Sequence, residues 1–239
     1  IRVDFSPKAG RKKRRNPPLV YDRFLVPLDG SKLAEAAAAH AAELARRCGA
    51  ELVLLRVCLD SKNLRQAVDY LDRVGEQARS EHLQARCEVY VGDPSSRILQ
   101  TATEEAVDLI VMSSHGDTGW LELFLGSNTE KIARLAPAKI LVVKGEGESP
   151  PPFKRILIPL DGSKRAETAI PLALDVAPGG SASITLAGIS VVFQEHAFEG
   201  DMRAMVEPDL KRIQEYLDGQ AEWLSSQGYQ VDTVIKRDE

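Results

Sequence analysis

The sequence predicts an α/β fold, namely a doubly wound, five-stranded parallel sheet that is followed by a partial second copy of the same fold. Short, continuous apolar runs alternate with longer stretches of helical periodicity, the pattern of a parallel sheet covered by helices on both faces. The first apolar run and the turn after it occur twice along the chain. The chain has 239 residues, of which 44% are apolar and 28% are charged. It is therefore long and apolar enough to form one large or two ordinary globular domains.

The first half of the chain holds five expected strands, each a short apolar run that ends at a polar or glycine-containing turn. The strands are expected at 23–28, 51–57, 87–92, 108–114 and 139–143. Helices are expected from the Asp29-Gly30 turn to near Gly49, from about 64 to 85, from Pro94, and from about 127 to 135. Pro94 favours a helix start because the N–H that proline lacks is unpaired in the first turn anyway.

An internal duplication sets the domain organisation. The segments RFLVPLDGSKLAE and RILIPLDGSKRAE, which begin at Arg23 and Arg155, agree at ten of thirteen positions with an offset of 132 residues. The second copy continues with a helix to about 177, a strand at 184–192, a helix at about 208–226 and a strand at 229–235. We therefore expect a basic disordered tail at 1–20, a first domain at 21–144, a linker at 145–153 and a second domain at 154–239 that lacks strands four and five.

Charge and cysteine usage narrow the class of protein. The stretch 8–18, KAGRKKRRNPP, cannot bury a core, and we interpret it as a solvated tail or an electrostatic arm for nucleic acid or a membrane surface. The formal net charge of −4 gives the rest of the chain no bias toward nucleic acid, which is not an expected partner. No apolar run reaches the roughly 18 residues of a membrane span. Three scattered cysteines favour a reducing compartment, so we expect a cytoplasmic protein.

The stretch SSHGDTGWLELFLGSNTEK, residues 113–131, follows the fourth expected strand and is the most suggestive motif. Gly116 and Gly126 would let a phosphate approach the backbone, and the N–H groups of the helix that starts after Gly126 would favour an anion. The residues of this candidate cradle are Gly116, Gly126, Ser127, Asn128 and Thr129. Ser127 and Glu130 also form a capping-box pattern, in which the helix satisfies its own N–H groups and needs no ligand.

Together these motifs resemble the universal stress protein family, here as a tandem member with an incomplete second copy. The resemblance rests on Pro-x-Asp-Gly-Ser after the first strand, Met-x-x-His-Gly at the fourth, and Gly-Ser nine residues later. It covers 21–144 fully and 154–239 in part. It implies a Rossmann-like sheet of the adenine-nucleotide α-hydrolase type that binds ATP, with Mg²⁺.

The resemblance also assigns roles to residues at the strand ends. It implies that Asp29 faces the adenine and ribose, with Pro27 beside it and Val57 lining the base. Met112 and Ser113, at the end of the fourth strand, complete the implied nucleotide-binding set. The family's nucleotide-binding members carry Gly-x-x-Gly before the nine-residue spacer, and this chain has Ser113 in place of the first glycine.

Two functions follow from these patterns. The first is an ATP-binding regulatory protein of the stress response, and the alternative is a nucleotide-free module for dimerisation and interaction. The Gly116, Gly126 and Ser127 set favours the first function, and Ser113 favours the second. No catalytic triad or metal-binding motif is present in the sequence, so we assign no catalytic residue and expect at most slow ATP hydrolysis. The expected partners are an adenine nucleotide, a protein that the sequence does not identify, and a second copy, in a homodimer or within the chain.

Overall fold

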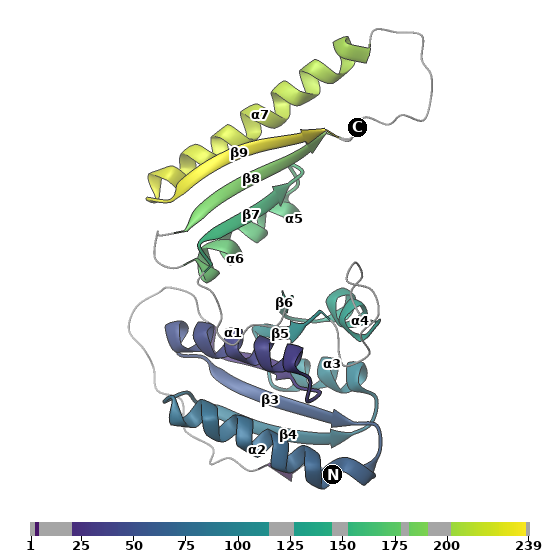
Figure 1. Cartoon of the computed structure of the whole chain (residues 1–239). Helices are drawn as coiled ribbons and strands as arrows, with labels where there is room; N and C mark the ends of the chain where they lie inside the picture. Colours follow the sequence, from purple (N-terminus) through teal and green to yellow (C-terminus); the bar gives the residue numbers. More distant parts are fainter. Residues whose placement is uncertain are drawn as a thin grey trace. The chain divides into compact units, whose positions relative to one another are not determined.

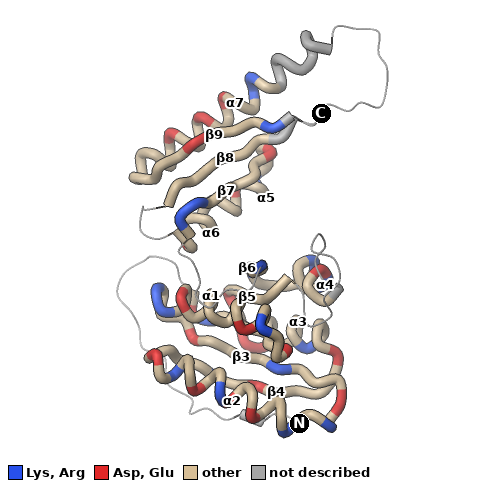
Figure 2. Tube along the Cα trace, viewed as in Figure 1, with Lys and Arg blue, Asp and Glu red and all other residues tan. Residues whose placement is uncertain are grey.

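The chain forms two compact units, Ile1–Pro150 and Pro151–Glu239, which we call unit 1 and unit 2 (Figure 1). The computed structural model describes residues 3–4, 21–114, 127–144, 153–177, 182–190 and 202–237. Acidic and basic residues are interspersed along the helices of both units (Figure 2). No helix within these residues is long and apolar enough to cross a membrane.

Unit 1 is built on a sheet with the strand order β1-β4-β3-β2-β5-β6. Its strands are β1 (Val3–Asp4), β2 (Arg23–Pro27), β3 (Glu51–Cys58), β4 (Ala85–Val91), β5 (Leu109–Ser113) and β6 (Lys139–Val143). Every pair from β4 to β6 is parallel, which confirms the predicted five-stranded, doubly wound sheet. The antiparallel pairing of β1 with β4 was not predicted, and it corrects the expected disorder at Val3 and Asp4. The basic stretch 8–18 lies outside the described residues.

The helices of unit 1 follow the predicted alternation. They are α1 (Lys32–Cys48), the short 3₁₀ helix η1 (Ser61–Asn63), α2 (Leu64–Ser80), α3 (Pro94–Glu104) and α4 (Ser127–Leu135). Helix α1 ends at Gly49, whose φ of 76° is left-handed. The predicted end of α2 near residue 85 is wrong, because His82 takes a left-handed φ of 63° and Ala85 already belongs to β4.

Helices cover both faces of the sheet in unit 1 (Figure 1). On one face, Ile98 of α3 and Ile132 of α4 pack into a cluster with strand residues. The strand residues of this cluster are Leu25, Val53, Leu55, Tyr90, Ile110 and Met112. On the other face α2 lies directly against β4, because a Cβ at Gly75 would stand 2.5 Å from Sγ of Cys87. Alternation of side chains along each strand therefore gives both faces an apolar surface to bury.

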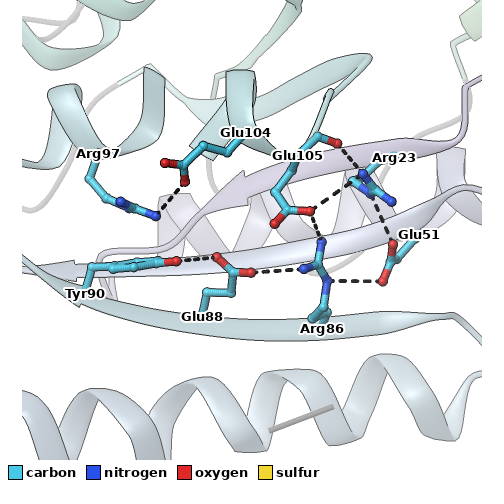
Figure 3. Close-up of polar contacts among 8 residues, drawn as sticks. All are labelled: Arg23, Glu51, Arg86, Glu88, Tyr90, Arg97, Glu104 and Glu105. Atoms are coloured by element: carbon cyan, nitrogen blue, oxygen red, sulfur yellow. Dashed lines mark hydrogen bonds and ion pairs between the residues drawn. The ribbon is translucent and has the colours of Figure 1, made fainter. Parts of the chain in front are cut away.

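An ion-pair network joins the amino-terminal ends of β2, β3 and β4 to the end of α3 (Figure 3). The guanidinium of Arg86 contacts Glu105 at 2.8 Å, Glu88 at 3.1 Å and Glu51 at 3.3 Å. Nε of Arg23 lies 3.2 Å from Glu51, and its Nη1 donates to the backbone carbonyl of Glu105. The side chains of Arg86 and Glu88 are only 12% and 1% exposed. The Arg86–Glu88 pair at the centre of the network is therefore largely buried, whereas Arg23, Glu51 and Glu105 are partly exposed. The network also places positive charge at the carboxyl end of α3, where the helix dipole favours it.

Unit 2 contains a parallel sheet in the order β7-β8-β9, which repeats the order β2-β3-β4 of unit 1. Its elements are β7 (Arg155–Leu160), α5 (Lys164–Glu167), α6 (Ala169–Val176), β8 (Ser183–Ser190), α7 (Met202–Ser226) and β9 (Gln230–Arg237). Helix α7 starts at Met202, so the predicted start near Pro208 is wrong. A proline removes one backbone donor, which does not prevent the preceding residues from being helical.

Helix α7 packs closely on the central strand of unit 2. A Cβ at Gly188 of β8 would stand 2.6 Å from Cγ2 of Ile213 and 3.2 Å from Cδ1 of Leu217. Ile184, Leu186 and Leu217 are almost fully buried in the core cluster of this unit. Glycine at position 188 therefore gives α7 the space it needs to reach the sheet.

Candidate functional site

The carboxyl ends of β2 and β5 meet where the strand order of unit 1 reverses. Strand β2 lies between β3 and β5, so the chain builds outward through β3 and β4 on one side and through β5 and β6 on the other. In open α/β sheets the connections that leave two such strands run in opposite directions and open a crevice in which ligands bind. The turns after β2 and β5 are therefore the candidate site of unit 1.

The turn after β2 presents the carboxylate of Asp29. Its Oδ1 accepts hydrogen bonds from the backbone N–H of Ser31 at 2.9 Å and from the Ser31 hydroxyl at 2.6 Å. The Ser31 hydroxyl oxygen in turn accepts from the N–H of Ala34 at 3.1 Å and caps α1. Gly30 permits the turn because its φ is +87°. The side chain of Asp29 is exposed, and Oδ1 is the oxygen engaged within the described residues.

The end of β5 is joined to the start of α4. Oγ1 of Thr129 donates to the backbone carbonyl of Ser113 at 3.3 Å, and the N–H of Ser114 donates to the carbonyl of Val143 at 3.0 Å. Ser113, Ser114 and Thr129 are buried, at 9%, 4% and 4% exposure. These bonds hold the amino terminus of α4, which is the positive end of its dipole, beside the carboxyl end of β5.

A second acidic turn, after β4, begins α3 beside α4. Oδ2 of Asp93 accepts from the N–H of Ser96 at 2.8 Å and from the hydroxyl of Ser95 at 2.9 Å. The hydrogen bonds from Ser96, and then that from Ser95, lower the pKa of Asp93 to about 2. Nζ of Lys131, in α4, lies 3.7 Å from the same oxygen. The pair links the starts of the two helices that cover this face of the sheet.

Apolar side chains lie below these turns. Met112 is buried in the core cluster of this face, and Val57 is partly buried against it. Pro27 ends β2 beside Leu55 of β3. An apolar surface with a few placed polar groups above it is the usual composition of a small-molecule site.

The residues that the sequence indicated and the structure describes all lie at the carboxyl ends of the strands or at the start of α4. They are Pro27, Asp29, Val57, Met112, Ser113, Ser127, Asn128 and Thr129. Asn128 is exposed, whereas the Thr129 hydroxyl already donates a hydrogen bond to the Ser113 carbonyl. Gly116, Gly126 and the side chain of Ser127 lie outside the described residues.

Sequence reasoning missed Arg56, which lies beside the Asp29 turn. Its Nη1 donates to the backbone carbonyl of Leu28 at 3.2 Å, and its guanidinium carbon lies 5.8 Å from the ring centroid of Tyr70 in α2. Burial, followed by the charge of Glu35, raises the pKa of Tyr70 above its ordinary value. A single charged residue inside the apolar run ELVLLRV was the available signal.

Within the ranges that the structure describes, no three His, Cys, Asp or Glu side chains gather closely enough to hold a metal ion. The candidate site is instead formed from a carboxylate, helix-terminal N–H groups and an apolar surface. Such a set suits an anionic ligand with an apolar ring better than it suits a bare cation.

Comparisons with known proteins bear on the family and the fold of the chain. Residues 20–144 match the sequence profile of the Universal stress protein family. The chain is 30% identical over 146 residues to the universal stress protein MJ0531 of Methanocaldococcus jannaschii, covering 54% of this chain and 86% of that one. It is 28% identical to YxiE of Bacillus subtilis, covering 52% of this chain and 100% of that one. A solved universal stress protein from Archaeoglobus fulgidus has a similar fold, with a TM-score of 0.67 and 19% identity, over 92% of this chain and 80% of that one.

Proposed function

Because the chain belongs to the universal stress protein family, we propose that unit 1 binds ATP or a related adenine nucleotide at the carboxyl ends of β2 and β5. The protein then acts as a regulator in the stress response, in which the bound nucleotide biases its contacts with partners. The observation that carries the proposal is the position of the Asp29 turn after β2 and of the α4 amino terminus at the end of β5, the two neighbouring strands at which the strand order reverses.

Each part of a nucleotide has a chemically suitable counterpart at this site. The exposed Asp29 carboxylate can accept hydrogen bonds from ribose hydroxyls. Pro27, Val57 and Met112 supply the apolar surface for the base. The phosphates go to the amino terminus of α4, at Ser127 and the residues after it, and to the glycine loop with Gly116 and Gly126. Ser113 and the Thr129 side chain are buried, and their hydrogen bond joins the end of β5 to the start of α4.

A magnesium ion fits this arrangement as a companion of the phosphates. The described residues provide no cluster of acidic ligands, and Mg²⁺ is usually bound through substrate phosphates and water with only one or two carboxylates. When bound, the ion neutralises phosphate charge. The residues of the chain hold the nucleotide through its base, its sugar and its phosphates.

Unit 2 is proposed as a partial second copy of the same domain. Its strand order and the Asp161-Gly162-Ser163 turn repeat those of unit 1. Oδ1 of Asp161 accepts from the N–H of Ser163 at 2.9 Å, the same bond that Asp29 makes with Ser31. Pairing of the two copies, or of two chains, is the form of assembly that this duplication favours.

A nucleotide-free interaction module is the second candidate, and one observation favours it. Ser113 replaces a glycine of the nucleotide-binding pattern, and the carbonyl of this residue is already bound by the Thr129 hydroxyl. In this case α4 is a helix capped by its own residues, and the two units serve only to contact other proteins.

Nucleotide analysis separates the two candidates. The purified protein is denatured, its supernatant is analysed for nucleotide, and the native protein is titrated with ATP and Mg²⁺. Asp29→Asn and Gly126→Val are expected to weaken binding. Asp161→Asn, the same change in the matching turn of unit 2, should leave it unaltered. Absence of co-purified nucleotide together with absence of ATP binding would favour the interaction module.

A further inference from the structure

The Arg56 side chain supports the turn after β2 from one side. Besides its 3.2 Å hydrogen bond to the Leu28 carbonyl, the guanidinium lies against Gly30, since a Cβ placed there would stand 3.4 Å from Nη1. The guanidinium also packs on the ring of Tyr70, with 5.8 Å between Cζ and the ring centroid. Arg56 thus binds the backbone before Asp29, lies beside the glycine after it, and packs against Tyr70 of α2.

The second copy of the turn offers a comparison within the same chain. Pro27 pairs with Leu55 and Pro159 pairs with Ala187, so the next residues along these strands, Arg56 and Gly188, occupy corresponding positions. In unit 2 the side chains of α7 fill the space beside Gly188. The unit 2 turn therefore has no cation at the position of Arg56.

The unit 2 turn nevertheless has the same local geometry. Gly162 has a φ of +79°, close to the +87° of Gly30, and Ser163 caps α5 through a 3.1 Å bond to the N–H of Ala166. Among the described residues, nothing lies within 4 Å of a Cβ placed at Gly162. Because this turn forms without an arginine, Arg56 is not needed to form its counterpart in unit 1.

We infer that Arg56 is a positioning residue of the nucleotide site. It holds the Leu28–Gly30 backbone so that the Asp29 carboxylate keeps a fixed direction toward the ligand. This inference rests on the proposed function, because it concerns the same site. Arg56 lies next to Val57 in β3, and alternation directs its side chain away from the face on which Val57 meets the core. It therefore acts through Asp29 and does not touch the ligand.

The test is a double-mutant cycle with ATP and Mg²⁺ as the probe. Arg56→Met removes the donor and keeps the length of the side chain, and we expect it to weaken ATP binding about tenfold, the equivalent of one charge-assisted hydrogen bond. In an Asp29→Asn background the same change should add less than about a twofold loss. Arg73→Met is the matched control, because Arg73 also lies over the Tyr70 ring, at 5.5 Å, but has no contact with the turn among the described residues. It should bind ATP like the wild type.

Each arm of the experiment has a distinct meaning. Unchanged binding by Arg56→Met, or losses that simply add to those of Asp29→Asn, would overturn the positioning role while leaving the proposed function intact. A wild type that does not bind ATP would overturn both. Arg56→Lys keeps a cation and a donor for the Leu28 carbonyl, so we expect it to recover part of the affinity. If Arg56→Met does not fold, Arg56→Lys replaces it in the cycle. The test is again whether its loss of ATP affinity becomes smaller in the Asp29→Asn background.

Discussion

Replacing Arg86 by methionine should strongly destabilise unit 1. The guanidinium meets three carboxylates, those of Glu51, Glu88 and Glu105, at 3.3 Å or less. Burial opposes its charge, but the hydrogen bond to Glu105 and the nearby carboxylates outweigh this effect and raise the pKa of Arg86. Removing one partner of a buried ion pair costs about 3–5 kcal/mol. Since Glu51 and Glu105 keep 27% and 19% exposure, we expect the lower end, about 3 kcal/mol.

Arg46 provides a matched control for this change. It also joins two carboxylates, those of Glu43 at 2.5 Å and Glu81 at 2.6 Å, but its side chain is 45% exposed. Exposed pairs contribute about 0.2–1 kcal/mol, because water screens the charges and ordering the side chains costs entropy. Because Arg46 makes two such pairs, Arg46→Met should cost at least about 1 kcal/mol less than Arg86→Met.

Urea unfolding followed by circular dichroism measures both variants against the wild type, with the transition of unit 1 analysed separately from that of unit 2. Adding Glu88→Gln to Arg86→Met should recover part of the lost stability, because the buried carboxylate becomes a neutral amide. Equal costs for the two arginine variants would refute the argument that burial of the network determines its contribution to stability.

Two further predictions concern unit 2 and the dependence of stability on pH. Gly188→Ala should destabilise unit 2 by about 1–3 kcal/mol, because the new methyl would overlap Ile213 of α7. Gly219→Ala should instead stabilise it by about 0.5–1 kcal/mol, because a Cβ there meets no atom of the described residues within 4 Å and alanine favours a helix; urea unfolding tests both changes. The folded-state pKa of Asp93, about 2, is below its ordinary 3.8, so its contribution to stability is present above about pH 4 and is lost as the pH falls toward 2. Thermal unfolding of wild type and Asp93→Asn should show a difference in Tm that shrinks as the pH falls from about 4 toward 2. A difference in Tm that stays constant would contradict the inference that hydrogen bonds from Ser96 and Ser95 stabilise the Asp93 carboxylate.

The sequence predicted the sheet well because its strands are short apolar runs with clear ends. The β6 run at 139–143 and helix α4 at 127–135 were located correctly, and the repeated opening segment indicated the second sheet. The predicted site residues that the structure describes lie at the carboxyl ends of the strands or at the start of α4, and the strand order brings β2 and β5 together. These features depend on local pattern and on rules that hold for the whole fold class.

The sequence-based predictions failed where tertiary contacts or single backbone angles determine the secondary structure. The left-handed φ of His82 ended α2 early, and the pairing of β1 with β4 joins segments that are distant in the sequence. The role of Arg56 depends on where α2 places Tyr70, which periodicity alone does not determine. A charged residue within an apolar strand was visible in the sequence, but its partners became evident only once the strands and helices were assembled.

The ion-pair network at the amino-terminal ends of the strands also bears on the order in which unit 1 folds. Arg23 and Glu105 lie 82 residues apart in the sequence, so their contact closes a long loop and comes at a high entropic cost. The strands and α3 must already be in place before Arg86 can meet its three carboxylates. We therefore expect this contact to form after the folding transition state. It should then slow the unfolding of unit 1 far more than it accelerates folding.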